Sequence, residues 1–353
     1  MKIMKHTTRF LVFIFVLIFI STIISSCKSD KPEEEIKPNI NLQSEHGIYI
    51  INEGNFQFGN ASISYYNADD KSVVEDIYKQ VNNQSLGDVC ESMSYINGWY
   101  YAVVNNSQKI EVLNPENFER RTSITGLTSP RYIIPVSRSK AYVSDYKSNR
   151  VSIINLSNNS KQGEITIHGW TEEMHMLYGK VFITNLKNDK LYVVNAANDL
   201  LEDSLVLAQC PGSIVEDKNG KLWVLCQGDA SMNKAGALFC INPVNKSIEK
   251  RMDFLLNESP KRLCINDTHD TLYYINKHVF QLAVSASSLP SSAIISGDAK
   301  NFYGLSIEPK TGHVFAADAI DYIQKGKIYN YNSKGTLISE FKVGLIPSKI
   351  YFK

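Results

Sequence analysis

Hydrophobic residues along this chain fall into short runs rich in β-branched and aromatic side chains, and polar turn residues separate one run from the next. Residues 126–167 show the pattern most completely, with runs at 126–136, 140–145, 150–156 and 163–167 bounded by Asn, Ser, Lys, Asp and Gly. Such runs fit pleated strands, whereas the bounding residues favour turns. The stretch therefore predicts four short antiparallel strands.

The same unit recurs along the chain at a steady interval. From Ala102 onward, the centres of its second strands are separated by 41, 40, 41, 50 and 42 residues. Four strands in about 40 residues are typical of a propeller blade. The chain is therefore predicted to be all-β, one seven-bladed β-propeller. The seven centres are Ile50, Ala102, Val143, Ile183, Val224, Tyr274 and Ala316.

Two irregularities of the repeat carry information. The long interval contains the polar, Gly-bearing residues 227–236, which predict a lengthened loop between the second and third strands of blade five. Residues 344–352 resemble the first strand of the complete unit, residues 126–134, whereas the first copy has no such strand. We therefore expect the C-terminal strand to complete blade one and to close the ring, leaving no long unpaired edge.

The N-terminus differs from the repeat and predicts a lipoprotein. A basic start, the apolar run 10–20 and small residues up to Cys27 are typical of a signal peptide over 1–26. Ile24-Ser25-Ser26-Cys27 resembles a lipobox, which implies acylation of Cys27. Residues 27–45 are charged and Pro-containing, so a flexible tether is expected before a propeller over 46–353. An outer-membrane, lipid-anchored protein follows. The acidic run directly after Cys27 resembles the surface-export signal of Bacteroidetes lipoproteins, which implies exposure at the cell surface; a plain solvated linker and a periplasmic orientation stay open as the alternative.

Charge and cysteine content exclude some classes of protein. Removing the signal takes away Lys2, Lys5 and Arg9, so Lys+Arg falls from 37 to 34 against 36 acidic residues, and no basic stripe suggests nucleic acid. Five cysteines remain after Cys27, and none forms a C-x-x-C motif. Cys226 and Cys240 lie on neighbouring strands, so a disulfide is possible, although buried free thiols are favoured.

Candidate ligand-binding residues follow from strand direction. In an antiparallel four-stranded blade, the loop before the first strand (the leading loop) and the loop joining the second to the third strand open on the same face. Those loops carry amide, charged and aromatic side chains that could bind a broad polar ligand. The candidates are Asn55, Phe56, Asn105, Asn106, Arg131, Tyr132, Asp145, Tyr146, Trp170, Glu172, Asn185, Tyr303 and Asp318.

A catalytic interpretation has less support. His168 and His175 are spaced unlike a helical zinc motif, and no G-x-S-x-G sequence occurs. Adjacent strand residues point to opposite faces, so at most one of Glu172 and Glu173 is expected to face the centre. A calcium-dependent lactonase would need a carboxylate and amide set that Glu53, Asp145, Asn185 and Asp318 could imitate. We expect no catalytic residue, metal site or cofactor, and no enzyme activity.

Several of these stretches together resemble the surface-exposed, cobalamin-capturing lipoproteins of Bacteroidetes, the BtuG-like group of YncE-like seven-bladed propellers. The stretches are residues 52–66, 86–88, 104–107, 128–132, 170–174, 303–305 and 316–326. The resemblance implies capture of a cobalamin-type corrinoid, which is transported rather than used as a cofactor, and its transfer to a TonB-dependent outer-membrane transporter. The alternatives are a propeller that binds glycan or protein, and a lactonase-like enzyme.

Overall fold

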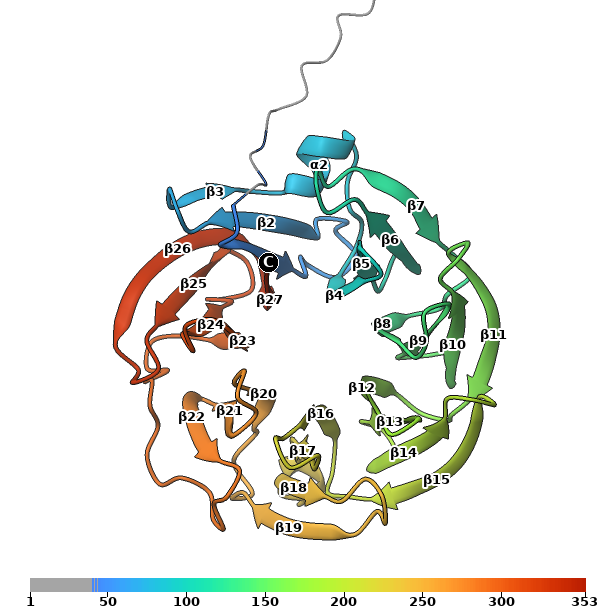
Figure 1. The fold of residues 1–353 in the computed structure, drawn as a ribbon. Coiled ribbons are helices and arrows are strands. Elements are labelled where there is room, and N and C mark those ends of the chain that lie inside the picture. The colour runs from blue at the N-terminus through green and yellow to red at the C-terminus, as the bar shows by residue number, and fades with distance from the viewer. Residues whose placement is uncertain (1–39, 41, 43) are drawn as a thin grey trace, which may run out of the picture. The chain divides into compact units, whose positions relative to one another are not determined.

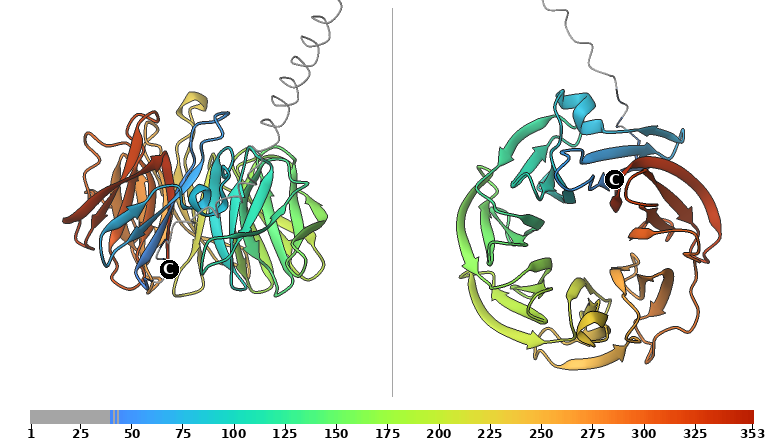
Figure 2. Two further views of the ribbon diagram at one scale, coloured as in Figure 1. Left: turned by 90° about the horizontal axis from the view of Figure 1, so that it is seen from above. Right: turned by 180° about the vertical axis from the view of Figure 1, so that it is seen from behind.

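The computed structural model describes residues 40, 42 and 44–353, whose strands form seven antiparallel sheets arranged in a ring (Figure 1). The central axis of this ring is called the channel. This confirms the predicted all-β, seven-bladed propeller. In each blade the first strand borders the channel and the last strand lies at the rim. Figure 2 shows the disc from its edge and from behind, with the loops gathered on its two flat faces.

The first four blades are complete sheets of four strands, ordered from the channel outward. Blade one contains β27 (Pro347–Phe352), β1 (Gly47–Asn52), β2 (Ser62–Asn67) and β3 (Ser72–Val74). Blade two contains β4 (Cys90–Ile96), β5 (Trp99–Val104), β6 (Lys109–Leu113) and β7 (Arg120–Ile124). Blade three contains β8 (Pro130–Pro135), β9 (Lys140–Asp145), β10 (Arg150–Asn155) and β11 (Ser160–Thr166). Blade four contains β12 (Thr171–Leu177), β13 (Lys180–Asn185), β14 (Lys190–Asn195) and β15 (Leu200–Val206).

The last three blades include the one departure from four strands among the described residues. Blade five contains β16 (Pro211–Glu216), β17 (Leu222–Cys226), β18 (Ala237–Ile241) and β19 (Ile248–Asp253). Blade six contains β20 (Lys261–Ile265), β21 (Thr271–Asn276) and β22 (His278–Ala283). Blade seven contains β23 (Phe302–Ile307), β24 (Val314–Asp318), β25 (Lys325–Tyr331) and β26 (Leu337–Leu345).

Blade six corrects the expectation that every unit has four strands. Residues 284–301 pair with it only through an isolated bridge between Val279 and Ile295. This segment contains Pro290 and several serines, which favour turns over a ladder of backbone hydrogen bonds. The lengthened loop of blade five is confirmed between β17 and β18, where it includes the short helix η1 (Ala230–Met232). The helix α2 (Ile77–Asn82), between blades one and two, has no counterpart in the predicted repeat.

The C-terminal strand closes the ring as the sequence predicts. β27 pairs antiparallel with β1, with Ile350 opposite Ile50 and Phe352 opposite Ile48. The C-terminal strand β27 thereby lies in the same sheet as β1, β2 and β3 (Figure 1). The first and last strands of the propeller are joined by backbone hydrogen bonds, so β1 has no free edge facing the channel.

The core lies between the blades. Each hydrophobic cluster takes residues from neighbouring sheets, as where Tyr101 and Val103 of β5 meet Ala141 and Val143 of β9. Middle strands are covered on both faces, which explains their nearly continuous apolar sequence. Burial of each large aliphatic side chain contributes about 1.5–3 kcal/mol. The repeat is therefore held together chiefly by contacts between one blade and the next.

The five described cysteines are all free thiols. In the hairpin of blade five, Cys226 lies opposite Ala237 and Cys240 opposite Trp223, so the register separates the two sulfur atoms. Within the part of the chain that the structure describes, no helix is long and apolar enough to cross a membrane. The predicted signal peptide, Cys27 and most of the predicted tether lie outside the described residues. Leu42, before the expected start of the propeller, is buried against blade one.

Candidate functional site

The innermost strand of every blade, which is β27 in blade one, contains a register shift near its start, at the end of the channel where the leading loops lie. In blade three, Pro130 pairs with Asp145 and Ile133 with Val143, so two residues of β8 lie opposite one residue of β9. Corresponding shifts occur in the other six blades. A β-bulge of this kind bends the strand and re-aims its side chains. Seven bulges at one level turn polar residues toward the channel.

These residues form two tiers, which we define from the centres of the second strands. In the innermost strand of each blade, one residue lies opposite the centre of the second strand. The mouth ring contains, from each blade, the residue two positions before that one in the sequence. Its members are Ser348, Glu91, Arg131, Glu172, Gly212, Lys261 and Tyr303. The throat ring contains, from each blade, the residue one position before the residue that lies opposite the centre of the second strand. Its members are Lys349, Ser92, Tyr132, Glu173, Ser213, Arg262 and Gly304.

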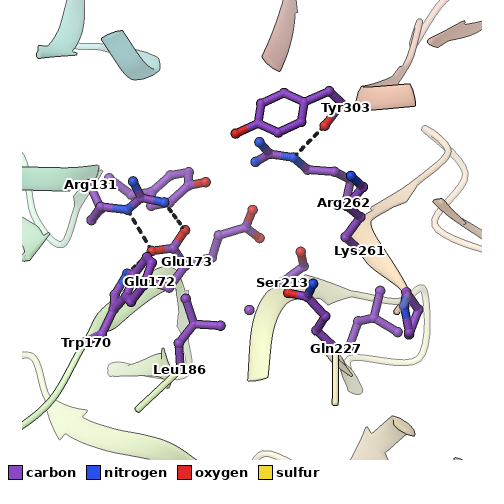
Figure 3. A pocket seen from close by; sticks show the side chains of 14 residues that line it. Arg131, Trp170, Glu172, Glu173, Leu186, Ser213, Gln227, Lys261, Arg262 and Tyr303 are labelled. Carbon is purple, nitrogen blue, oxygen red and sulfur yellow. Dashed lines mark hydrogen bonds and ion pairs between the residues drawn. The ribbon is translucent and has the colours of Figure 1, made fainter. Parts of the chain in front are cut away.

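Arg131 holds one side of the mouth ring together. Its Nε and one terminal nitrogen donate to both oxygens of Glu172 at 2.8 and 2.7 Å, and its other terminal nitrogen donates to Glu91 at 2.5 Å. Trp170 Nε1 donates to Glu172 at 2.6 Å (Figure 3). Burial raises the pKa of Glu91 to about 7, since the nearby charges of Glu53 and Glu172 add to burial while Arg131 opposes it. Bidentate pairing fixes the guanidinium plane before any ligand arrives.

Tyr303 organises the opposite side. Its hydroxyl donates to Glu53 at 2.9 Å, and its backbone oxygen accepts a hydrogen bond from Arg262 Nε at 2.9 Å. Arg262 also lies 3.5 Å from a Glu53 oxygen, and both its guanidinium and the Lys261 ammonium lie over the Tyr303 ring. Figure 3 shows Tyr303 and Arg262 across the pocket from Arg131 and Trp170.

An ion pair crosses the throat of the channel. Lys349 Nζ donates to Glu173 at 2.9 Å, and the same ammonium lies 5.0 Å from the centre of the Tyr132 ring. Glu173 also accepts a hydrogen bond from the backbone N–H of Ile214. A pocket of about 270 Å³ lies toward the leading loops, and a cavity of about 320 Å³, partly lined by Lys349 and Glu173, lies further along the channel.

The structure corrects the expectation that only one of two adjacent glutamates faces the centre. Both Glu172 and Glu173 line the same pocket. The reason is the bulge in β12, which lies between Thr171 and Met174 and breaks the strict alternation of side chains.

Five of the predicted residues come together in this pocket, and the others do not. Those that line it are Arg131, Tyr132, Trp170, Glu172 and Tyr303. Tyr146 lies at its edge, with its ring 4.2 Å from that of Trp170. Phe56 is exposed on the loop after β1, and Asn55 on the same loop donates to the backbone oxygen of Tyr322.

Several predicted polar residues have their hydrogen bonds satisfied inside loops. Asp145 accepts from the backbone N–H groups of Ser129, Lys147 and Ser148, and Asn185 accepts from those of Lys187 and Asn188. Asp318 accepts from two backbone N–H groups in the same way. Asn105 donates to the backbone oxygen of Pro130, and Asn106 donates to Asp88. These side chains fix the loop conformations that support the pocket.

Sequence reasoning does not single out the other pocket and ring residues. Lys261 and Arg262 occur in a predicted leading loop, and Glu53 in a predicted second-to-third loop. Glu91, Glu173 and Lys349 are missed as well, because strand alternation hides which residues a bulge turns inward. Apart from Glu53, their common signal is position, because each lies two residues or one residue before the residue opposite the centre of the second strand. Among the described residues, no three His, Cys, Asp or Glu side chains are grouped so as to hold a metal ion.

Fold and site define a seven-bladed propeller with a polar, internally paired pocket at one end of its channel. The chain belongs to the family described as Domain of unknown function (DUF5074), whose model matches residues 46–352. A search of curated proteins finds no match.

Two solved structures illustrate the shared fold. A quinonprotein alcohol dehydrogenase-like protein from Bacteroides thetaiotaomicron is 14% identical, with a TM-score of 0.71 over 89% of this chain and 79% of that one. The periplasmic gluconolactonase of Pseudomonas aeruginosa is 12% identical, with a TM-score of 0.66 over 86% of this chain and 99% of that one. At such identities the likeness is one of fold.

Proposed function

We propose that this protein captures a cobalamin-type corrinoid on the face that bears the leading loops and passes it to a TonB-dependent outer-membrane transporter. The observation that carries the proposal is the mouth of the central pocket. There Arg131, Trp170 and Tyr303 converge from blades three, four and seven. The resemblance of the sequence to cobalamin-capturing propellers supplies the class of ligand.

The pocket side chains are held in place before a ligand binds. Trp170 is fixed by its hydrogen bond to Glu172 and by the Tyr146 ring, and Arg131 is fixed by two carboxylates. Little side-chain entropy remains to be lost on binding, which favours high affinity for a ligand that meets many of these groups. A corrinoid is broad and rimmed with amides, so it can contact several blades at once.

The size of the pocket favours a ligand that covers the mouth. A volume of about 270 Å³ is just below the range that is usual for pockets of drug-sized ligands, so the pocket is too small to enclose a corrinoid. Exposed aromatic side chains of the second-to-third loops, Phe56, Tyr146 and Tyr322, extend the available surface beyond the pocket. We therefore place the macrocycle over the mouth, with only part of the ligand inside.

Anchoring through Cys27 and delivery to a transporter complete the proposal. Acylation would hold the propeller at the outer membrane, where several acyl chains give a stable anchor. A binding protein so placed raises the local concentration of its ligand near a transporter in the same membrane.

The alternative with a structural neighbour is a lactonase-like enzyme, since one similar fold belongs to a gluconolactonase. Equilibrium dialysis of the purified protein against cyanocobalamin, with glucono-lactone hydrolysis measured on the same sample with and without calcium, separates the two functions. We expect retention of cyanocobalamin and no hydrolysis above the uncatalysed rate. Calcium-dependent hydrolysis, or dialysis without retention at micromolar protein, would contradict the proposal and favour an enzyme or a binder of glycan or protein.

A further inference from the structure

The net charges of the two walls of the pocket differ in sign. On the wall formed by blades two to four, the guanidinium of Arg131 lies between two carboxylates, Glu91 and Glu172. On the wall formed by blades six and seven, Lys261 and Arg262 share one carboxylate, Glu53, which lies 3.5 Å from Arg262. Glu173, between the walls, is neutralised by Lys349. One wall therefore has an excess of positive charge.

Among the described cations that line the pocket, Arg131 and Arg262 have carboxylates at ion-pair distance and Lys261 has none. Its ammonium lies 5.2 Å from the centre of the Tyr303 ring, and the Arg262 guanidinium lies 5.1 Å from the same centre. Within the described part of the chain, Lys261 Nζ has no hydrogen bond and no carboxylate at ion-pair distance. Burial, followed by the charge of Arg262, lowers the pKa of Lys261. A half-buried ammonium held beside a second cation is costly unless an anion joins it.

Two residues of the pocket, Ser213 and Gly212, provide a hydrogen-bond donor and an unfilled space. Ser213 is a largely buried residue of the pocket wall, and its hydroxyl has no hydrogen-bond partner among the described residues. Gly212 occupies the mouth-ring position of blade five, where Arg131 and Glu172 stand in the preceding blades. A Cβ atom added at Gly212 would meet only a Leu186 methyl group, at 3.6 Å. The mouth ring is therefore open beside Ser213.

We propose that Lys261, Arg262 and Ser213 form a subsite for an oxyanion, which is a phosphate or carboxylate group. This group would bind in the open space that a side chain at Gly212 would otherwise fill. The ammonium and guanidinium would supply charge-assisted hydrogen bonds, and the hydroxyl would supply a neutral one. Figure 3 shows Ser213 and Arg262 facing the same open part of the pocket. The inference goes beyond corrinoid capture, because the subsite would hold the anionic group of any ligand seated on this face.

Isothermal titration of the detergent-purified full chain with sodium phosphate and with sodium acetate, at constant ionic strength set by chloride, tests the subsite. We expect saturable binding of at least one anion, and Lys261→Gln should weaken it about ten-fold. The matched control is Lys147→Gln, because Lys147 also lies over a tyrosine ring, 5.4 Å from that of Tyr146, but does not line the pocket. Its anion affinity should stay within about two-fold of the wild type.

A second variant tests the open space of the subsite without changing the net charge of the protein. Gly212→Leu should fill the open space and abolish anion binding, whereas its melting temperature should stay close to that of the wild type, because the backbone at Gly212 requires no left-handed conformation. Binding of phosphate alone or of acetate alone would identify the preferred group.

The proposal is overturned if neither anion binds the wild type, if Lys261→Gln binds as tightly as the wild type, or if both lysine variants lose affinity equally. Cyanocobalamin titrated into the same samples reports separately on corrinoid capture.

Discussion

Lys349 and Glu173 form an ion pair 2.9 Å long between blades one and four, although 176 positions separate them in the sequence. The pair joins the closing strand β27 to the far side of the channel. Its side chains retain only 26% and 17% of their exposure, so water screens it less than a surface pair. It is thus a direct link across the ring between elements that share no sheet.

A double-mutant cycle should detect this link. Lys349→Met and Glu173→Gln, alone and together, are expected to show a coupling of about 1–2 kcal/mol in the free energy of unfolding. The matched control is the exposed pair Lys277 and Asp298, with 68% and 71% side-chain exposure, whose coupling should be near zero. Chemical denaturation measures all the proteins of both cycles. Equal coupling in both cycles would show that the throat pair gives no particular stability.

The closing strand itself is testable by truncation. Deleting residues 347–353 removes β27, which pairs with β1 and buries Ile350, so the melting temperature should fall by at least about 10 °C. Deleting Lys353 alone leaves the strand intact and should change it by less than about 3 °C. Differential scanning calorimetry compares the two. Unchanged melting of the longer truncation would rule out closure of the ring by β27.

Much of the fold could be predicted because every blade repeats one pattern of apolar runs and turns. The three-stranded sheet of blade six could not, since its missing fourth strand depends on the Ser- and Pro-containing residues 284–301 rather than on the repeat. The site was only partly predictable. Trp170 and Arg131 lie where leading loops must meet the channel, so strand direction alone locates them.

The remaining site residues depend on structure that alternation does not reveal. Glu173 and Lys349 face the channel because bulges shift the register of β12 and β27. Conversely, Asp145 and Asn185 have the residue types of a ligand site, yet their side chains accept hydrogen bonds from backbone N–H groups of their own loops and, for Asp145, of the adjacent leading loop as well. A loop-capping role and a ligand-binding role use the same acceptors, so residue type cannot distinguish them.

The raised pKa of Glu91 predicts a dependence of stability on pH. Because the folded state holds this proton with a pKa of about 7 against 4.5, its favourable contribution is complete below 4.5 and is lost as pH rises toward 7. The loss amounts to at most about 3 kcal/mol. Glu91→Gln removes the titration, so the variant should gain stability relative to the wild type as pH rises from about 5 to about 7.5. A difference in unfolding free energy that does not change with pH would contradict the assignment.

Cys27 should anchor the protein to the membrane. The lipobox predicts that Cys27→Ala abolishes acylation and releases the propeller from the membrane fraction. Metabolic labelling with palmitate, followed by fractionation, measures both effects, and Cys90→Ala is the control that should keep label and anchoring. Palmitate label that persists in Cys27→Ala would refute the lipoprotein prediction.

Isothermal titration with cyanocobalamin most directly tests whether a corrinoid binds over the mouth of the pocket. We expect saturable binding to the wild type and a loss of about 1–3 kcal/mol of binding free energy in Trp170→Ala. The control is Trp99→Ala, because Trp99 begins β5 away from the pocket and packs against Arg121. Its affinity should equal that of the wild type. An absence of heat with the wild type, or equal affinities of the wild type and Trp170→Ala, would contradict corrinoid binding over the mouth of the pocket.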